Sequence, residues 1–256
     1  MPTYNEAQTI RPTIEALLHH TSTLGADVLV VDDGSPDGTG ALVSAHPQYG
    51  TSVYLLSRPG KLGLGEAYRA GFAWALAQGY AVVVQMDADG SHPAHRIPAM
   101  VAELARCDVV IGSRYVPGGE TSGWNWKRRL LSRGANGYVR RALRLSETDA
   151  TSGFRAWRSS AIQRSRIEFS HSEGFSFQIE TTWRADRAGL RVHELPIVFV
   201  ERSSGTSKMS REIATEAFCR VLVWRLSELA GSWRAMGRGG ATIGWAPPRH
   251  VGRSGR

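Results

Sequence analysis

Short apolar strands alternate with amphipathic helical stretches over the first 112 residues, and this pattern restricts the possible folds most strongly. Helices are predicted from Ile10 to about His20, with Thr9 as the cap and Pro12 in the first turn, and near 39–46, 66–78 and 97–105. Such alternation is the signature of a doubly wound, mostly parallel α/β sheet. The predicted strands are Asp27–Asp33, Ser52–Ser57, Val82–Met86 and Asp108–Gly112.

Two carboxylates follow the strand predicted at Val82–Met86. Asp87 and Asp89 are separated by one residue. Ligands of open α/β sheets bind at the carboxyl ends of the strands, and two carboxylates there can hold a hard divalent cation. A solvated turn explains the same pattern, since Asp and Gly are common in turns. His92 and His95 are ligands by residue type, but an oxygen-rich site favours Mg²⁺ or Mn²⁺ over zinc.

The net charge of +8 predicts an anionic partner, such as nucleic acid, a phosphorylated substrate or an acidic membrane surface. Basic residues are concentrated in Thr121–Leu145, which contains tryptophan and leucine side chains but no acidic residue. A nucleic-acid-binding protein would explain this charge. It would not explain acidic clusters at successive strand ends, which would repel the phosphate backbone. We therefore expect no nucleic-acid partner.

The domain organisation and location follow from composition. We expect one catalytic domain over residues 1–230 and a basic, disordered tail over 231–256, which is rich in Gly and Arg and has no acidic residue. No stretch approaches 18 consecutive apolar residues, and the N-terminus does not resemble a signal peptide. Cys107 and Cys219 form no CxxC pair, which favours a reducing compartment. We expect a cytoplasmic protein that does not span a membrane.

Eight short segments occur in a recognisable order along the chain. They are PTYNE at 2–6, VVDDGSPDGT at 30–39, RPGKLGLGEAY at 58–68, MDADGSHP at 86–93, GSRY at 112–115, DATSGFRA at 149–156, SEGFSFQIE at 172–180 and ERSSGTSKMS at 201–210. In this order and spacing they resemble the inverting family 2 glycosyltransferases, and among these the polyprenol-phosphate (dolichol-phosphate) mannose synthases. The resemblance covers roughly residues 2–210.

The resemblance implies a GT-A fold and the transfer of mannose, with inversion, from GDP-mannose to polyprenyl phosphate. It also implies a divalent cofactor, Mg²⁺ or Mn²⁺, and peripheral association with the cytoplasmic face of an anionic membrane. A polyprenyl-phosphate glucosyltransferase that uses UDP-glucose is the alternative. The sequence leaves open the polyprenol length and whether a membrane partner protein is required.

The same resemblance assigns residues to the two substrates. Ionised carboxylates are hydrogen-bond acceptors only, which suits ribose hydroxyls and guanine N–H groups. The donor-binding residues would be Pro2, Tyr4, Glu6, Asp33, Lys61 and Asp87. The metal ligands would be Asp87, Asp89 and Ser91. The catalytic residues would be Asp89, Arg114, Arg202 and Lys208, and the last three, which are cations, would stabilise the phosphates and the leaving GDP.

Arg128 and Ser132 match the family's motif for the acceptor phosphate. They are four residues apart and share one face if 124–145 is helical. Trp124, Trp126, Leu130 and Leu131 surround them, as in a helix that lies among lipid headgroups. An ordinary amphipathic helix with a solvated basic face is the alternative. Because the acceptor phosphate is already anionic, we expect charge neutralisation and alignment, with no general base.

One departure from the family concerns the first strand. In the family an apolar strand leads into the PTYNE segment, and here Met1 stands where that strand should end. We therefore expect the first strand of the sheet to be missing at the N-terminus. Since that strand would be central, its neighbours would carry unpaired backbone groups.

Overall fold

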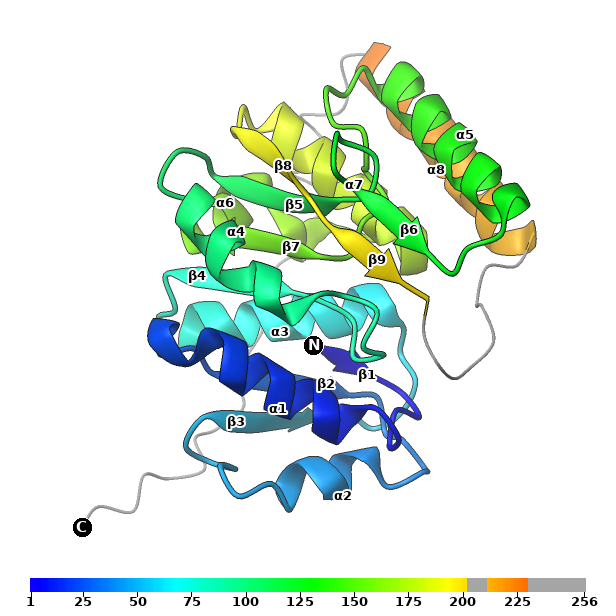
Figure 1. Cartoon of the computed structure of the whole chain (residues 1–256). Helices are drawn as coiled ribbons and strands as arrows, with labels where there is room; N and C mark the ends of the chain where they lie inside the picture. The colour runs from blue at the N-terminus through cyan, green and yellow to red at the C-terminus, as the bar shows by residue number, and fades with distance from the viewer. Residues whose placement is uncertain (202–210, 230–256) are drawn as a thin grey trace.

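The computed structural model describes residues 1–201 and 211–229 (Figure 1). The helices are α1 (Ile10–Thr21), α2 (Thr39–Ser44), α3 (Leu64–Ala77), α4 (Ile97–Glu103), α5 (Trp126–Leu143), α6 (Ser159–Ser165), α7 (Gly174–Arg187) and α8 (Arg211–Leu229). The strands are β1 (Pro2–Thr3), β2 (Val28–Asp32), β3 (Val53–Ser57), β4 (Val82–Gln85), β5 (Val109–Ser113), β6 (Glu120–Ser122), β7 (Arg155–Arg158), β8 (Val192–Pro196) and β9 (Val198–Val200). Arg202, Lys208 and the predicted tail lie outside the described residues.

The strands form two main sheets whose neighbours are mostly parallel. The first has the order β1-β2-β3 and is parallel throughout, with Val28 opposite Val53. The second has the order β4-β7-β5-β8, in which β5 and β8 are parallel and β7 is antiparallel to β4 and β5. A short parallel ribbon pairs β6 with β9. This arrangement confirms the predicted α/β class.

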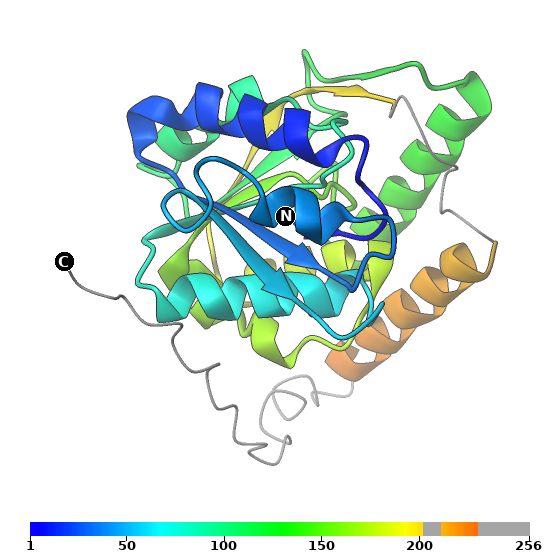
Figure 2. The same ribbon diagram turned by 90° about the horizontal axis from the view of Figure 1, so that it is seen from below.

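Helices cover both faces of the sheets, as the two views show (Figures 1 and 2). Successive residues of β5 show why its sequence is apolar throughout: Val110 belongs to the core that includes α1 and α4, whereas Val109 belongs to the core that includes α3, α6 and α7. A strand buried on both faces has no polar side. A third cluster joins α5, α7 and α8 through Leu143, Trp183 and Trp224.

Several local predictions were wrong. Thr9 precedes α1 as expected, but its hydroxyl does not cap the helix and instead donates to Glu6 Oε2 at 3.0 Å. The apolar stretch at 192–200, which reads as one strand in the sequence, forms two strands in different sheets, β8 and β9. Neither β7 nor α6 was predicted. Among the described residues, we find no helix with the length and hydropathy needed to cross a membrane.

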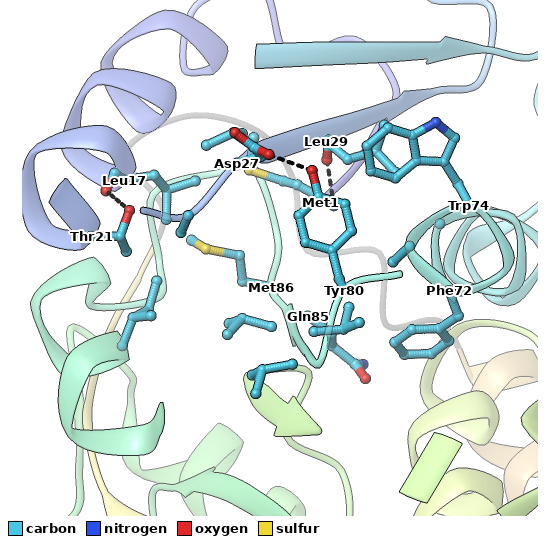
Figure 3. Close-up of a pocket in the computed structure, with 18 of the residues that line it drawn as sticks. Met1, Leu17, Thr21, Asp27, Leu29, Phe72, Trp74, Tyr80, Gln85 and Met86 are labelled. Carbon is cyan, nitrogen blue, oxygen red and sulfur yellow. Dashed lines mark hydrogen bonds between the residues drawn. The ribbon is translucent and has the colours of Figure 1, made fainter. Parts of the chain in front are cut away.

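A cavity of about 360 Å³ separates β2 from β4, each of which contributes residues to its lining (Figure 3). Here β1 consists of only two residues, which pair with Val31 and Asp32. The Met1 amino group donates to the Leu29 carbonyl at 2.9 Å, and the Tyr80 hydroxyl donates to Asp27. The expected gap in the centre of the sheet is therefore present, and it is closed at one end by β1.

Candidate active site

The loop after β4 presents its two carboxylates on one side. Met86 and Ala88 are buried in the core beneath the loop, whereas Asp87 and Asp89 are partly exposed. The Thr13 hydroxyl donates to the Ala88 carbonyl at 3.2 Å and ties the loop to α1. The alternation of buried and exposed residues thus turns both carboxylates away from the core.

Asp87 is held through its side chain and its backbone. The Tyr68 hydroxyl donates to Asp87 Oδ1 at 3.0 Å, and the Asp87 N–H donates to His92 Nδ1 at 3.0 Å. Burial lowers the pKa of His92, so the ring is neutral at pH 7 and carries its proton on Nε2. Nε2 lies 4.0 Å from Asp87 Oδ2. His92 therefore supports the loop and offers no lone pair to a metal.

Ser91 orients the second carboxylate. Its hydroxyl and its N–H both donate to Asp89 Oδ1, at 2.5 and 3.1 Å. Ser91 was predicted as a metal ligand, but here its hydroxyl is directed at Asp89. Among the side chains that the structure describes, in residues 1–201 and 217–228, no group of three His, Cys, Asp or Glu residues could hold a metal ion. The candidate metal ligands at this loop are two aspartates.

Arg114 lies at the end of β5 and is buried. Its Nε and one Nη donate to Asp149 at 2.7 and 2.6 Å, and that Nη also donates to the Thr151 hydroxyl at 2.8 Å. Burial alone would lower the pKa of Arg114, but the Asp149 carboxylate outweighs it and raises the pKa. Arg114, which was predicted to stabilise the phosphates, is thus permanently charged and links the end of β5 to the loop at 149–153.

The loop at 149–153 reaches the aspartates. A Cβ added to Gly153 would lie 3.6 Å from both carboxylate oxygens of Asp87, so the backbone passes close to that side chain. Arg155, which is fully buried, holds the loop by donating to the carbonyls of Ala150, Ser152 and Gln178. Burial lowers the pKa of Arg155 to about 10, so it remains charged at pH 7.

Two predicted donor residues meet at the ends of the first sheet. The Lys61 ammonium lies 4.7 Å from the centre of the Tyr4 ring. Asp33 is buried, pairs with Arg58 at 2.8 Å and accepts from the N–H groups of Leu62 and Gly63. Asp33 therefore shapes the loop that carries Lys61.

The two remaining donor candidates have structural contacts of their own. Pro2 is buried in β1, where it is paired with Val31. Glu6 accepts a hydrogen bond from Thr9 in the turn that leads into α1. Pro2 in β1 and Glu6 in the segment that joins β1 to α1 are both close in sequence to Tyr4.

The predicted acceptor residues lie on α5. The Arg128 guanidinium pairs with Glu201 and lies 4.1 Å from the centre of the Trp124 ring. Ser132 accepts a hydrogen bond from the Tyr115 hydroxyl at 2.6 Å. Trp124 was expected to face lipid, but it is buried because it packs between Arg114, Arg128 and Phe199. That expectation is wrong.

The sequence profile of glycosyl transferase family 2 matches residues 1–166. The chain belongs to this family. Two curated relatives extend the similarity over nearly the whole chain. A polyprenol monophosphomannose synthase of Mycolicibacterium smegmatis is 44% identical over 229 residues, which are 88% of this chain and 84% of that protein. An undecaprenyl-phosphate mannosyltransferase of Micrococcus luteus is 42% identical, over 92% of this chain and 95% of that protein.

Solved structures with much lower sequence identity share the fold. Glucosyl-3-phosphoglycerate synthase from Mycobacterium tuberculosis, in complex with Mn²⁺, UDP and phosphoglyceric acid, superposes with a TM-score of 0.63 at 21% identity, covering 90% of this chain and 76% of that one. Its complex with phosphoglyceric acid alone gives a TM-score of 0.62 at 20% identity and covers 78% of that chain. The likeness confirms the predicted GT-A fold.

Residues that were not singled out from the sequence complete the candidate site. Tyr68 and Asp149 hold Asp87 and Arg114, and Glu194 accepts from the N–H groups of Thr148 and Asp149. Tyr68 and Asp149 lie in the RPGKLGLGEAY and DATSGFRA segments. These motifs indicated that Tyr68 and Asp149 are functionally relevant, but the residues that they contact, Asp87 and Arg114, are distant in sequence.

Proposed function

We propose that this family 2 glycosyltransferase transfers mannose from GDP-mannose to polyprenyl phosphate, with inversion at the anomeric carbon. The observation that carries the proposal is the identity of 44% and 42% to two proteins named for mannose transfer to polyprenyl phosphates, over 84% and 95% of their lengths. The family and the fold set the reaction class, and the relatives supply the sugar and the acceptor.

The donor nucleotide would lie across the ends of the first sheet. Tyr4 and Lys61, which already contact each other, would meet the nucleotide from two loops. Glu6 follows Tyr4 by two residues, while Pro2 and Asp33 would act by shaping the backbone around them, since both are buried. Their positions support a nucleotide site at this end of the sheet.

Asp87 and Asp89 would hold Mg²⁺ or Mn²⁺ on the donor diphosphate. Two partly exposed carboxylates on one loop fit such an ion, because Mg²⁺ is usually bound by one or two carboxylates together with substrate phosphates and water. The bound cation would neutralise the charge of the leaving diphosphate. Ser91 would act indirectly, by orienting Asp89.

The acceptor phosphate would attack without a general base. One of its oxygens forms the new bond to C1 of mannose from the face opposite the diphosphate, the bond from C1 to the diphosphate oxygen breaks, and GDP leaves with the electron pair. Arg128 would bind the acceptor phosphate through its planar guanidinium, after exchanging Glu201 for it. Ser132 would add a donor at the same helix face.

Helix α5 and its neighbour α8 would place the active site at a membrane surface. On α5 the side chains of Trp126, Leu130 and Leu131 are 69%, 65% and 58% exposed, and basic residues lie among them. On α8, which lies beside α5 in Figure 1, Phe218 and Leu226 are also exposed. Apolar side chains among cations are typical of helices that bind anionic lipid surfaces.

A donor panel tests the function. The protein is incubated with radiolabelled GDP-mannose or UDP-glucose, polyprenyl phosphate and Mg²⁺ or Mn²⁺, and the label extracted into organic solvent is counted. We expect label in the lipid fraction from GDP-mannose only, and none without the acceptor. Label from UDP-glucose alone would replace mannose by glucose, and no label from either donor would overturn the proposal.

A further inference from the structure

Tyr68 contacts the loop that carries Asp87 and Asp89 from the side of α3, whereas α1 contacts that loop through Thr13. Tyr68 belongs to α3 and its side chain is buried, with only its hydroxyl directed at Asp87 Oδ1. The ring stacks on Phe177 with centres 5.5 Å apart and planes inclined by 3°, and it also packs on Phe72. Since the ring is enclosed by aromatic neighbours, its hydroxyl has little freedom to follow a moving carboxylate.

The helix that carries Tyr68 is fixed at its first turn. The Gly65 N–H donates to Glu173 Oε2 at 2.7 Å, and Arg69 donates to Glu173 Oε1 at 2.8 Å and to the Ser170 hydroxyl at 3.1 Å. A Cβ at Gly65 would lie 2.3 Å from the Ser172 carbonyl oxygen, so the two segments are in close contact. The position of the Tyr68 hydroxyl is therefore set by two packed helices, α3 and α7.

We propose that Tyr68 is a positioning residue that commits Asp87 Oδ1 to a hydrogen bond and so leaves Oδ2 to bind the metal ion as a single-oxygen ligand. The inference rests on the proposed function, in which Asp87 is a metal ligand. A carboxylate fixed in this way suits Mg²⁺ and Mn²⁺. Mg²⁺ demands near-ideal octahedral geometry, whereas Ca²⁺ also accepts two oxygens of one carboxylate. Tyr68 would thus set ion preference as well as affinity.

The chain offers a matched control for removing this hydroxyl. Tyr80 also donates its hydroxyl to an aspartate, Asp27, but it does so at the cavity between β2 and β4 (Figure 3). Tyr68→Phe and Tyr80→Phe therefore delete the same group and the same kind of hydrogen bond at two different places. Asp87 is partly exposed, so water can solvate Oδ1 in Tyr68→Phe and the fold should persist.

The experiment measures metal binding in the absence of substrates. Mn²⁺ is titrated into each variant and free Mn²⁺ is followed by electron paramagnetic resonance, and Ca²⁺ is then used as a competitor. For Tyr68→Phe we expect Mn²⁺ affinity to fall about tenfold, as is typical for loss of an outer-shell partner. Ca²⁺ affinity should fall less, so that the preference for Mn²⁺ narrows. Tyr80→Phe should retain wild-type values for both ions.

The variant Asp87→Asn distinguishes failure of the positioning role of Tyr68 from failure of the proposed metal site. If Asp87→Asn weakens Mn²⁺ binding while Tyr68→Phe changes neither affinity nor preference, the positioning role is wrong and the proposed metal site stands. If Asp87→Asn leaves Mn²⁺ binding unchanged, the metal site itself is wrong. If Tyr68→Phe does not fold, Phe177→Leu can be used, because it removes the aromatic ring that packs on Tyr68 and keeps the Tyr68 hydroxyl. An unchanged preference between Mn²⁺ and Ca²⁺ in that variant would also overturn the inference.

Discussion

The guanidinium of Arg128 pairs with the carboxylate of Glu201, 73 residues further along the chain, while it lies over the ring of Trp124. A carboxylate and a phosphate present similar oxygens to an arginine. Glu201 therefore occupies the position that an acceptor phosphate bound to Arg128 would take, and under the proposed function the two would compete for this one cation.

Glu201→Gln should lower the apparent KM for polyprenyl phosphate. The ion pair is partly exposed and such pairs contribute up to about 1 kcal/mol, so we expect a decrease of about two- to fivefold. The KM for GDP-mannose should not change. Steady-state rates at varied acceptor concentration measure both values, and an increased acceptor KM would show that Glu201 assists the acceptor.

Arg128→Ala should act in the opposite direction. Loss of a charge-assisted hydrogen bond costs about 1.5–3 kcal/mol, so the apparent KM for the acceptor should rise about tenfold or more, with donor binding nearly unchanged. Lys127→Ala removes a charge from the neighbouring, exposed position and serves as the control. A variant that loses donor affinity and keeps acceptor affinity would contradict the assignment.

Asp89→Ala should abolish transfer, and Asp87→Ala should do so nearly as strongly. Charge neutralisation by a metal ion stabilises the transition state by several kcal/mol, which corresponds to a loss of at least about 100-fold in rate. Excess EDTA should have the same effect on the wild type, with recovery after Mg²⁺ or Mn²⁺ is added. Full activity of either variant, or in EDTA, would refute the metal assignment.

Trp126→Ser combined with Leu130→Ser should weaken binding to anionic liposomes. Each of these exposed side chains would contribute about 1.5–3 kcal/mol on burial in lipid, so we expect a loss of about tenfold or more in partitioning, measured by co-sedimentation. Leu42→Ser, an exposed leucine on α2, is the control. Unchanged binding in the double variant would leave α5 as an ordinary surface helix.

The parallel framework was predictable because its strands are apolar on both faces, as Val109 and Val110 illustrate. Strand β7 was not, because Arg155 and Arg158 make it resemble a surface segment. Arg155 is nevertheless fully buried, since backbone carbonyls from the loop at 149–153 and from α7 surround its guanidinium. Such contacts are not local, and no periodicity in the sequence reports them.

The candidate site was predictable where its residues lie close together on one loop. Asp87 and Asp89 lie on one loop, and their exposure follows from the burial of Ala88 between them. The environment of Arg114 was not predictable, because Asp149 is 35 residues away. Trp124 was misassigned for the same reason: its neighbours Arg114 and Phe199 come from other elements.

An apolar strand of about five residues fused before Met1 should raise the melting temperature. It would occupy the cavity between β2 and β4 and pair with both edges. A polar Gly/Ser segment of the same length is the control, since it cannot replace the apolar contacts. Equal melting temperatures for the two fusions and the starting protein would show that the cavity does not accept a strand.

The Met1 amino group adds a pH dependence to the unextended protein. Burial lowers its pKa from 8.0 to about 5, against the opposing effect of Asp87. Between these values the unfolded chain binds the extra proton, so the free energy of unfolding should rise with pH from about 5 to 8, by up to about 4 kcal/mol. Denaturant titrations across this range measure the slope. Acetylation of the amino group should remove it, and a slope of opposite sign would contradict the burial.

The division of the sheet also has a mechanical consequence. Directional hydrogen bonds hold the strands together within β1-β2-β3 and within β4-β7-β5-β8, whereas mainly apolar side chains and the cavity lie between the two sheets. Tyr4 and Lys61 stand on one side of this seam, and Asp87 and Asp89 on the other. A ligand that touches both sides acts as a cross-link. Its binding would stiffen the whole domain and slow amide exchange in β2 and β4, even before any bond is made or broken.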